Sequence, residues 1–112
     1  MSGDAIFLNH LGIVCALGDG ADEVRAAMLR TDAPQGVAAN DGLLPGQTLA
    51  LGAVSRPLPT LDHHPAPLLG RNNALLRAAY LQIHGQVQQA IERHGPSRVA
   101  VVVGTSTSGI GE

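Results

Sequence analysis

Residues 98–112 read R-V-A-V-V-V-G-T-S-T-S-G-I-G-E and contain the clearest structural signal in the chain. Val99 to Val103 is an unbroken apolar run with four valines, a pattern typical of a strand buried on both faces. The run leads into Gly104 and then a segment of Ser, Thr and Gly. Because α/β proteins often place ligand chemistry where a central strand opens into a small-residue loop, we expect a candidate binding loop there.

Upstream of this run, the spacing predicts one long amphipathic helix over about residues 69–93. Its apolar stripe repeats at three- and four-residue steps and comprises Leu76, Ala79, Tyr80, Ile83, Val87, Ala90 and Ile91. Gly95-Pro96 is typical of a helix end, since proline cannot continue the helix.

The first third of the chain predicts a strand over about residues 5–9, a close turn near Gly12 and a helix that ends near Arg30. Asp22 and Glu23 would lie in the first turn of that helix, where the helix dipole favours negative charge. Proline and glycine interrupt residues 31–68 repeatedly, so we expect an irregular region with one short strand at 48–54. The order of these elements predicts an α/β fold and one domain over 1–112.

Composition narrows the function classes. The chain has 112 residues and a net charge of −2, so its charge does not favour binding to nucleic acid. No apolar run is long enough to cross a bilayer, no basic cluster suits a membrane surface, and the N-terminus lacks the charged region of a signal peptide. A single Cys suits a reducing compartment, so we expect a cytoplasmic protein.

The isolated reactive residues have simple structural interpretations. Cys15 lies among apolar neighbours and is interpreted as a small buried residue rather than a nucleophile. His63 and His64 lie in a Pro-rich loop without a third ligand at metal-binding spacing, which favours a solvated loop. We expect His84 and His94 on the surface of the long helix, and we expect no metal site.

The loop after the apolar run is the main candidate for a ligand site. It lacks the Gly-Lys-Ser/Thr ending of a P-loop and the G-x-G-x-x-G spacing of a dinucleotide fold. Its backbone N–H groups and hydroxyls could hold an anion, while a tight packed turn explains the same residues. A small α/β phosphate-binding module therefore stays open as an alternative.

Three stretches together resemble the N-terminal portion of the β-ketoacyl-acyl carrier protein synthases, the condensing enzymes of the thiolase fold. The stretch Asn9-His10-Leu11-Gly12-Ile13-Val14-Cys15-Ala16-Leu17-Gly18 resembles the family's opening motif. Gly70-Arg71-Asn72-Asn73 resembles the start of its long N-terminal helix. Residues 98–105 resemble the strand and Gly-rich loop that follow. The three occur in the family's order and span essentially the whole chain.

The resemblance implies the N-terminal part of a thiolase-like layered fold, with a mixed β-sheet and packed helices, incomplete in this chain. It also implies a decarboxylating Claisen condensation that joins an acyl group to malonyl units on acyl carrier protein, with no metal or soluble cofactor. The family's catalytic Cys and two His would lie beyond Glu112, so the 112 residues alone would be inactive. The enzyme would be a homodimer, or a heterodimer with a related subunit.

Within this chain, the resemblance places Thr105, Ser106, Thr107, Ser108 and Gly109 in a loop beside the acyl pocket and the dimer interface. Thr107 would line the acyl pocket of its own subunit or of its partner. A non-catalytic chain-length-factor-type subunit has the same N-terminal part, and it stays open as an alternative. For the 112 residues alone, we expect exposed apolar surface and self-association.

Overall fold

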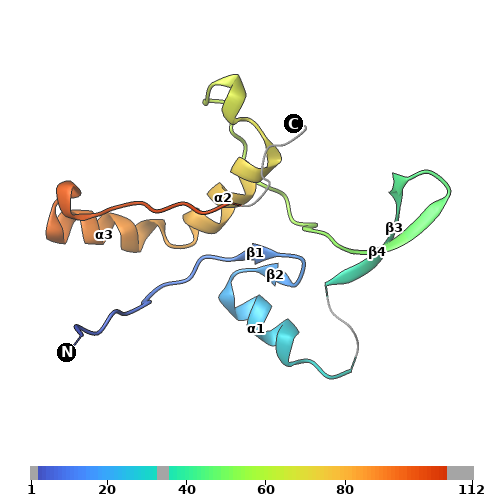
Figure 1. Ribbon diagram of the computed structural model, residues 1–112, viewed down its shortest axis with the longest axis horizontal. Helices are drawn as coiled ribbons and strands as arrows, with labels where there is room; N and C mark the ends of the chain where they lie inside the picture. The colour runs from blue at the N-terminus through green and yellow to red at the C-terminus, as the bar shows by residue number, and fades with distance from the viewer. Residues whose placement is uncertain (1–2, 33–35, 106–112) are drawn as a thin grey trace.

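The structure is a computed structural model, and it describes residues 3–32 and 36–105 (Figure 1). The elements are β1 (Val14–Cys15), β2 (Gly18–Asp19), α1 (Ala21–Leu29), β3 (Val37–Leu44), β4 (Gln47–Gly52), a 3-10 turn (Ala66–Leu68), α2 (Arg71–Leu81), α3 (His84–His94) and a second 3-10 turn (Pro96–Arg98). β1 pairs with β2, and β3 pairs with β4, in two separate antiparallel sheets. The chain is therefore mixed α/β, as predicted in coarse terms.

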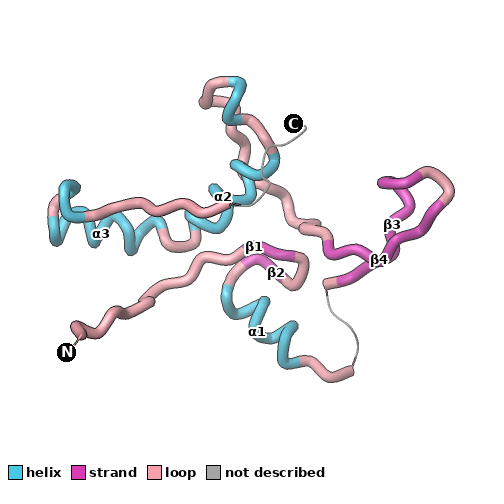
Figure 2. The backbone as a smooth tube through the Cα atoms, viewed as in Figure 1, coloured by secondary structure: helices cyan, strands magenta, loops and turns pink. Residues whose placement is uncertain are grey.

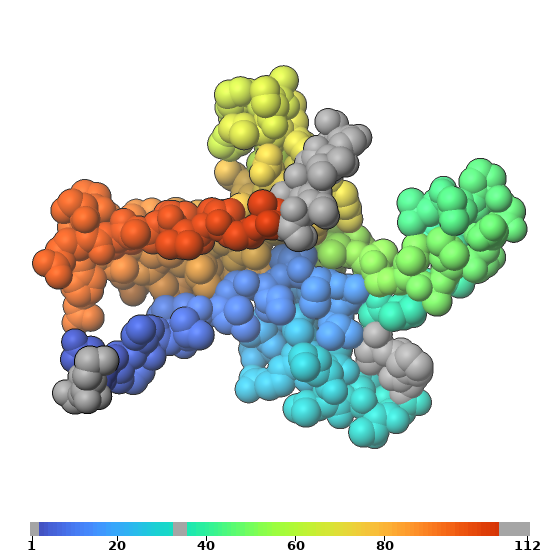
Figure 3. Space-filling view, in the orientation of Figure 1, coloured from blue at the N-terminus to red at the C-terminus, as the bar shows by residue number. Residues whose placement is uncertain are grey.

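The described residues form an open arrangement with little core. Only Val24, Leu61 and Ala74 are buried apolar residues among them. The radius of gyration is 17.8 Å, against about 13 Å for a compact domain of this length. Figure 3 shows the same openness, because the β3–β4 hairpin and the described N-terminal segment extend as separate arms. Most apolar side chains thus lack the neighbours that a closed domain would give them.

The predicted first helix is confirmed as α1. Gly20 precedes it at φ 111°, a conformation that suits glycine, and its backbone N–H donates to the Ile13 carbonyl at 2.9 Å. Asp22 and Glu23 occupy the first turn as expected. Val24 is the buried residue of the helix, whereas Met28, four residues later, is largely exposed.

The prediction of an irregular region over 31–68 was wrong in part, because β3 and β4 form a hairpin there. The expected strand at 48–54 appears as β4, and Val37 pairs with Gly52 at the base of the hairpin. The turn uses Gly46 at φ 79°, which glycine adopts without strain. The sequence obscured β3 because Asn40-Asp41-Gly42 interrupts its alternation and the register shifts between Asn40 and Leu44. The hairpin extends away from the helices (Figure 2).

The single helix predicted over 69–93 is two helices, α2 and α3. At the junction the N–H groups of Gln82 and Ile83 donate to carbonyls three residues back, at 3.3 and 3.0 Å, and this tight turn ends α2. Ile83, at φ −116° and ψ 5°, leaves helical geometry before α3 begins. The end at Gly95 is confirmed, with φ 84° immediately after His94.

The two remaining strand predictions, at 5–9 and 99–103, were wrong, and so was the predicted burial of 99–103. No residue of either segment belongs to a sheet, and Figure 2 draws both as loop. Ile6 and Leu8 are 92% and 97% exposed, and Val102 is 95% exposed. The physical reason is that the described residues place no further strand beside either segment to complete a hydrogen-bond ladder.

Candidate functional site

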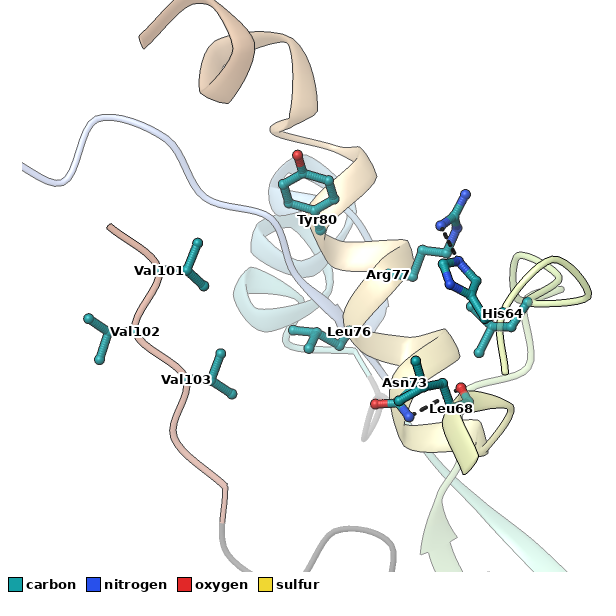
Figure 4. A pocket seen from close by; sticks show the side chains of 10 residues that line it. His64, Leu68, Asn73, Leu76, Arg77, Tyr80, Val101, Val102 and Val103 are labelled. Atoms are coloured by element: carbon teal, nitrogen blue, oxygen red, sulfur yellow. Dashed lines mark hydrogen bonds between the residues drawn. The ribbon is translucent and has the colours of Figure 1, made fainter. Parts of the chain in front are cut away.

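One cavity is an open groove between α2 and the chain segment that follows Val99, here called the α2 groove. It has a volume of about 440 Å³ and is lined largely by apolar side chains. These include Leu61, Leu68, Leu76, Val101 and Val103. Figure 4 shows that Val101 and Val103 point toward α2, whereas Val102 points away from it. The segment thus alternates like a strand, although no strand among residues 3–32 and 36–105 pairs with it.

Two polar contacts lie on the rim of the α2 groove. Arg77 Nη1 lies 3.3 Å from His64 Nε2, and Asn73 Nδ2 donates to the Leu68 carbonyl at 3.2 Å (Figure 4). Since a guanidinium only donates, His64 Nε2 is the acceptor in this contact. Among the described residues Arg77 has no carboxylate partner. These contacts hold the Ala66–Leu68 turn and the neighbouring loop against α2.

The opening motif docks on the C-terminal end of α2. A Cβ on Gly12 would overlap the Ala79 carbonyl oxygen, so only glycine allows this approach. The turn predicted near Gly12 lies instead at Ala16 and Leu17, between β1 and β2. Gln82 Oε1 accepts from the Ile13 N–H at 2.9 Å, and Gln82 Nε2 donates to the Ile13 carbonyl at 3.1 Å. Nε2 also donates to Asp19 Oδ1 at 2.7 Å. One amide side chain at the C-terminal end of α2 therefore binds Ile13, which directly precedes β1, and Asp19 of β2.

A second polar cluster fixes the start of α1. Glu23 Oε2 accepts from the Asp19 N–H at 3.0 Å, and Glu23 Oε1 accepts from Arg56 Nη2 at 2.7 Å. The hydrogen bond from the Asp19 backbone and the Arg56 guanidinium lower the pKa of Glu23. The carboxylate is exposed, and its role is to join β2, α1 and the segment after β4.

The predicted site loop falls largely outside the described residues. Thr105 is exposed at the end of the described segment, next to the α2 groove, while Ser106, Thr107, Ser108 and Gly109 lie outside it. The roles expected of these five residues therefore stay predictions.

The other singled-out residues lie apart from one another. Cys15 is half-buried in β1, where it pairs with Gly18. His63 is exposed in a loop, and His84 and His94 are exposed on α3, as expected. In the described part of the chain no group of three His, Cys, Asp or Glu side chains could hold a metal. Arg77 and His64 were not predicted to meet, because nothing in the sequence brings the 63–64 loop to α2.

Comparison with family models, curated proteins and solved structures finds no match for this chain. Within 3–32 and 36–105, no helix has the length and apolar character needed to cross a membrane. Any statement about function therefore rests on the residues themselves and on how the fold brings them together.

Proposed function

We propose that this chain is the N-terminal part of a 3-oxoacyl-[acyl carrier protein] synthase with a thiolase-like layered fold. The observation that carries the proposal is that the three stretches resembling this family, distant in sequence, meet at α2. Gly70-Arg71-Asn72-Asn73 begins the helix. The opening motif contacts its C-terminal end, and residues 101–103 run along its side.

The contacts at α2 are specific rather than incidental. Gly12 fits against Ala79 with no room for a side chain, and Gln82 satisfies both backbone groups of Ile13. On the other side of the helix, Val101 and Val103 face Leu76 and Tyr80 across the groove. An N-terminal unit of such an enzyme requires that the three motifs follow the family's order and that they lie together in space. Both features support the proposal.

The exposed surface area of the chain also supports the proposal that the chain is part of a larger protein. A compact monomer of 11.5 kDa would expose about 5,800 Å², whereas this chain exposes 9348 Å². The surplus of about 3,500 Å² is in the range that obligate interfaces bury. Further strands of a layered sheet would cover the open faces of residues 5–9 and 99–103 in such an enzyme.

In the proposed reaction an acyl group is held as a thioester on a cysteine of the enzyme. Malonyl-carrier protein loses CO₂, and the resulting carbanion attacks the thioester carbonyl. The products are a 3-oxoacyl-carrier protein and the free cysteine thiol. The cysteine and two histidines would belong to segments after Glu112, so this part contributes scaffold and the 105–109 loop. The proposal includes acyl carrier protein as partner, a dimer, a cytoplasmic location and no metal or soluble cofactor.

The test uses the protein purified from the cells that make it, with acyl- and malonyl-carrier protein as substrates. Mass spectrometry of the carrier protein should show a 3-oxoacyl product two carbons longer than the acyl donor, with one CO₂ released for each. Iodoacetamide should block the product by alkylating one cysteine outside residues 1–112. Absence of condensation, alone and with added related subunits, would contradict the proposal.

The same assay separates the enzyme from a chain-length-factor-type subunit. Such a subunit would yield no product alone but would change the length of chains made by a catalytic partner. A Thr107→Phe variant of the active protein should lose activity on long acyl chains before short ones, because the ring would shorten the pocket. An unchanged chain-length profile would remove Thr107 from the pocket.

A further inference from the structure

Two Asp-Gly dipeptides occur in the chain, Asp19-Gly20 and Asp41-Gly42. An aspartate that precedes glycine is open to spontaneous rearrangement, because glycine has no Cβ to shield its backbone nitrogen from the aspartate side chain. The rearrangement requires that this nitrogen and this side chain are free to approach each other. The structure places the two dipeptides in opposite situations, so one serves as the reference for the other.

The Asp19-Gly20 dipeptide is held by hydrogen bonds on both reacting groups. Asp19 Oδ1 accepts from Gln82 Nε2 at 2.7 Å, and the Gly20 N–H donates to the Ile13 carbonyl at 2.9 Å. The Asp19 N–H also donates to Glu23 Oε2 at 3.0 Å. Rearrangement at Asp19 therefore requires that these hydrogen bonds open first.

The Asp41-Gly42 dipeptide lies in the irregular part of β3, on the hairpin that extends away from the helices (Figure 2). Both residues are exposed, and residues 41–43 pair with no residue of β4, because the register shifts between Asn40 and Leu44. The Gly42 N–H donates to Asn40 Oδ1 at 3.0 Å, in an exposed contact that competes with water. Within 3–32 and 36–105 the Asp41 carboxylate makes no ion pair. Both reacting groups are thus accessible to each other.

We propose that Asp41-Gly42 is a modification site at which Asp41 isomerises spontaneously to isoaspartate. The Gly42 nitrogen attacks Cγ of the protonated Asp41 carboxyl group. The N–Cγ bond forms, the Cγ–OH bond breaks, and the N–H proton leaves with the hydroxyl group as one water. The product is a five-membered succinimide ring. This inference does not rest on the synthase proposal.

The second step opens the ring. Water adds to the main-chain carbonyl carbon of Asp41 and breaks its bond to the Gly42 nitrogen, so the main chain now runs through Cβ and Cγ of residue 41. The former main-chain carbonyl becomes a free carboxylate. One water is released and one is consumed, and the reaction therefore needs no oxidant, reductant or other reactant.

The position of the site in β3 allows the fold to accept the product. Isoaspartate lengthens the main chain by one carbon, and the register is already interrupted at this point. Residues 37–40 pair with 49–52 on one side of the site, and only Leu44 and Gln47 pair on the other side. We therefore expect modified chains to keep the base of the hairpin and to accumulate in the folded protein.

The experiment uses the protein isolated from the cells that make it, incubated for weeks at mildly acidic pH. Cleavage after arginine places Asp19 and Asp41 on different peptides, and electron-transfer fragmentation distinguishes isoaspartate from aspartate in each. One hydrogen bond contributes a factor of about 2 to 10, so the two that hold the reacting groups of Asp19-Gly20 should make isomerisation about 5- to 100-fold faster at Asp41. In guanidinium, which unfolds both sites, the two rates should converge. Equal rates in the folded protein, a faster rate at Asp19, or no isoaspartate at Asp41 would overturn the proposal.

Two variants test the cause of the difference. In Gly42→Ala the new Cβ would meet only Asn40 Oδ1, at 3.7 Å, and the backbone there has no positive φ, so the fold should be kept. The methyl group should slow isomerisation at Asp41 about tenfold by shielding the nitrogen. Gln82→Ala should speed isomerisation at Asp19 about 2- to 10-fold and leave Asp41 unchanged, because it frees only the Asp19 carboxylate. An Asp41 that isomerises equally fast in Gly42→Ala and wild type would refute the attack by the Gly42 nitrogen.

Discussion

Removing the Gln82 amide should detach the β1–β2 hairpin from α2. In Gln82→Ala three hydrogen bonds are lost, at 2.9, 3.1 and 2.7 Å, to Ile13 N, Ile13 O and Asp19. Each such bond contributes about 0.5–1.5 kcal/mol, and two of them are half-buried. Counting only the two half-buried bonds, because the exposed one to Asp19 competes with water, we expect the free energy of local opening at Ile13 to fall by about 1–3 kcal/mol.

The assay is amide hydrogen exchange at Ile13, followed by NMR. The expected change is exchange about 5- to 150-fold faster in Gln82→Ala than in wild type. Gln88→Ala is the matched control, because it removes the same side chain from the exposed face of α3. Gln82→Glu should resemble Gln82→Ala at neutral pH. It keeps an acceptor for the Ile13 N–H but loses both donors and adds negative charge beside Asp19.

Two results would refute this reasoning. One is an Ile13 amide that exchanges equally fast in Gln82→Ala and Gln88→Ala. The other is a wild-type Ile13 amide with no protection at all, since the structure assigns it a 2.9 Å hydrogen bond to Gln82 Oε1. Either would mean that Gln82 does not hold the hairpin on α2.

Other predictions concern single backbone or charged positions. Gly85 lies in α3 with open space around it, so Gly85→Ala should raise the free energy of unfolding in urea by about 1 kcal/mol. Gly95 has φ 84°, so Gly95→Ala should lower that free energy by a similar amount. Changes of the opposite sign would contradict the two backbone geometries. Gly12→Val should lower the free energy of unfolding by about 1–3 kcal/mol, because the valine side chain would overlap an α2 carbonyl group. Gly3→Val should leave the free energy of unfolding unchanged, because no atom lies near that position. The hydrogen bond from the β2 backbone and the nearby guanidinium lower the pKa of Glu23 below its ordinary 4.5. Stability from this carboxylate is therefore present above about pH 4.5 and is lost as the pH falls through the lower native value. Urea midpoints of Glu23→Gln should lie below those of wild type at neutral pH and converge with them in acid; a constant gap would contradict this.

Local signals in the sequence predicted the helical parts well. The first-turn acids Asp22 and Glu23 located α1, and Gly95-Pro96 located the end of α3. The close approach at Gly12 was also predictable, since glycine inside an apolar run suggests tight packing. These features depend on a few neighbouring residues and need no knowledge of the rest of the chain.

Features that depend on distant contacts were not predictable. The break between α2 and α3 interrupts a continuous apolar stripe, and the Gln82 side chain at this break is bound 69 residues away in sequence, at Ile13. The β3–β4 hairpin has too irregular an alternation to reveal β3. The run 99–103 has the composition of a buried strand, but its burial requires neighbours that the described residues do not place beside it. For the site, the sequence predicted the valines of the α2 groove only as part of a buried strand, and it did not predict the contact between Arg77 and His64.

The most direct test of the central claim is the intact mass of the protein isolated from the cells that make it, with peptide mapping of the same sample. If this chain is the N-terminal part of a condensing enzyme, peptides from 1–112 should come from a protein several times heavier than 11.5 kDa. That protein should contain a further cysteine and further histidines downstream of Glu112. A native protein of 11.5 kDa would contradict the claim.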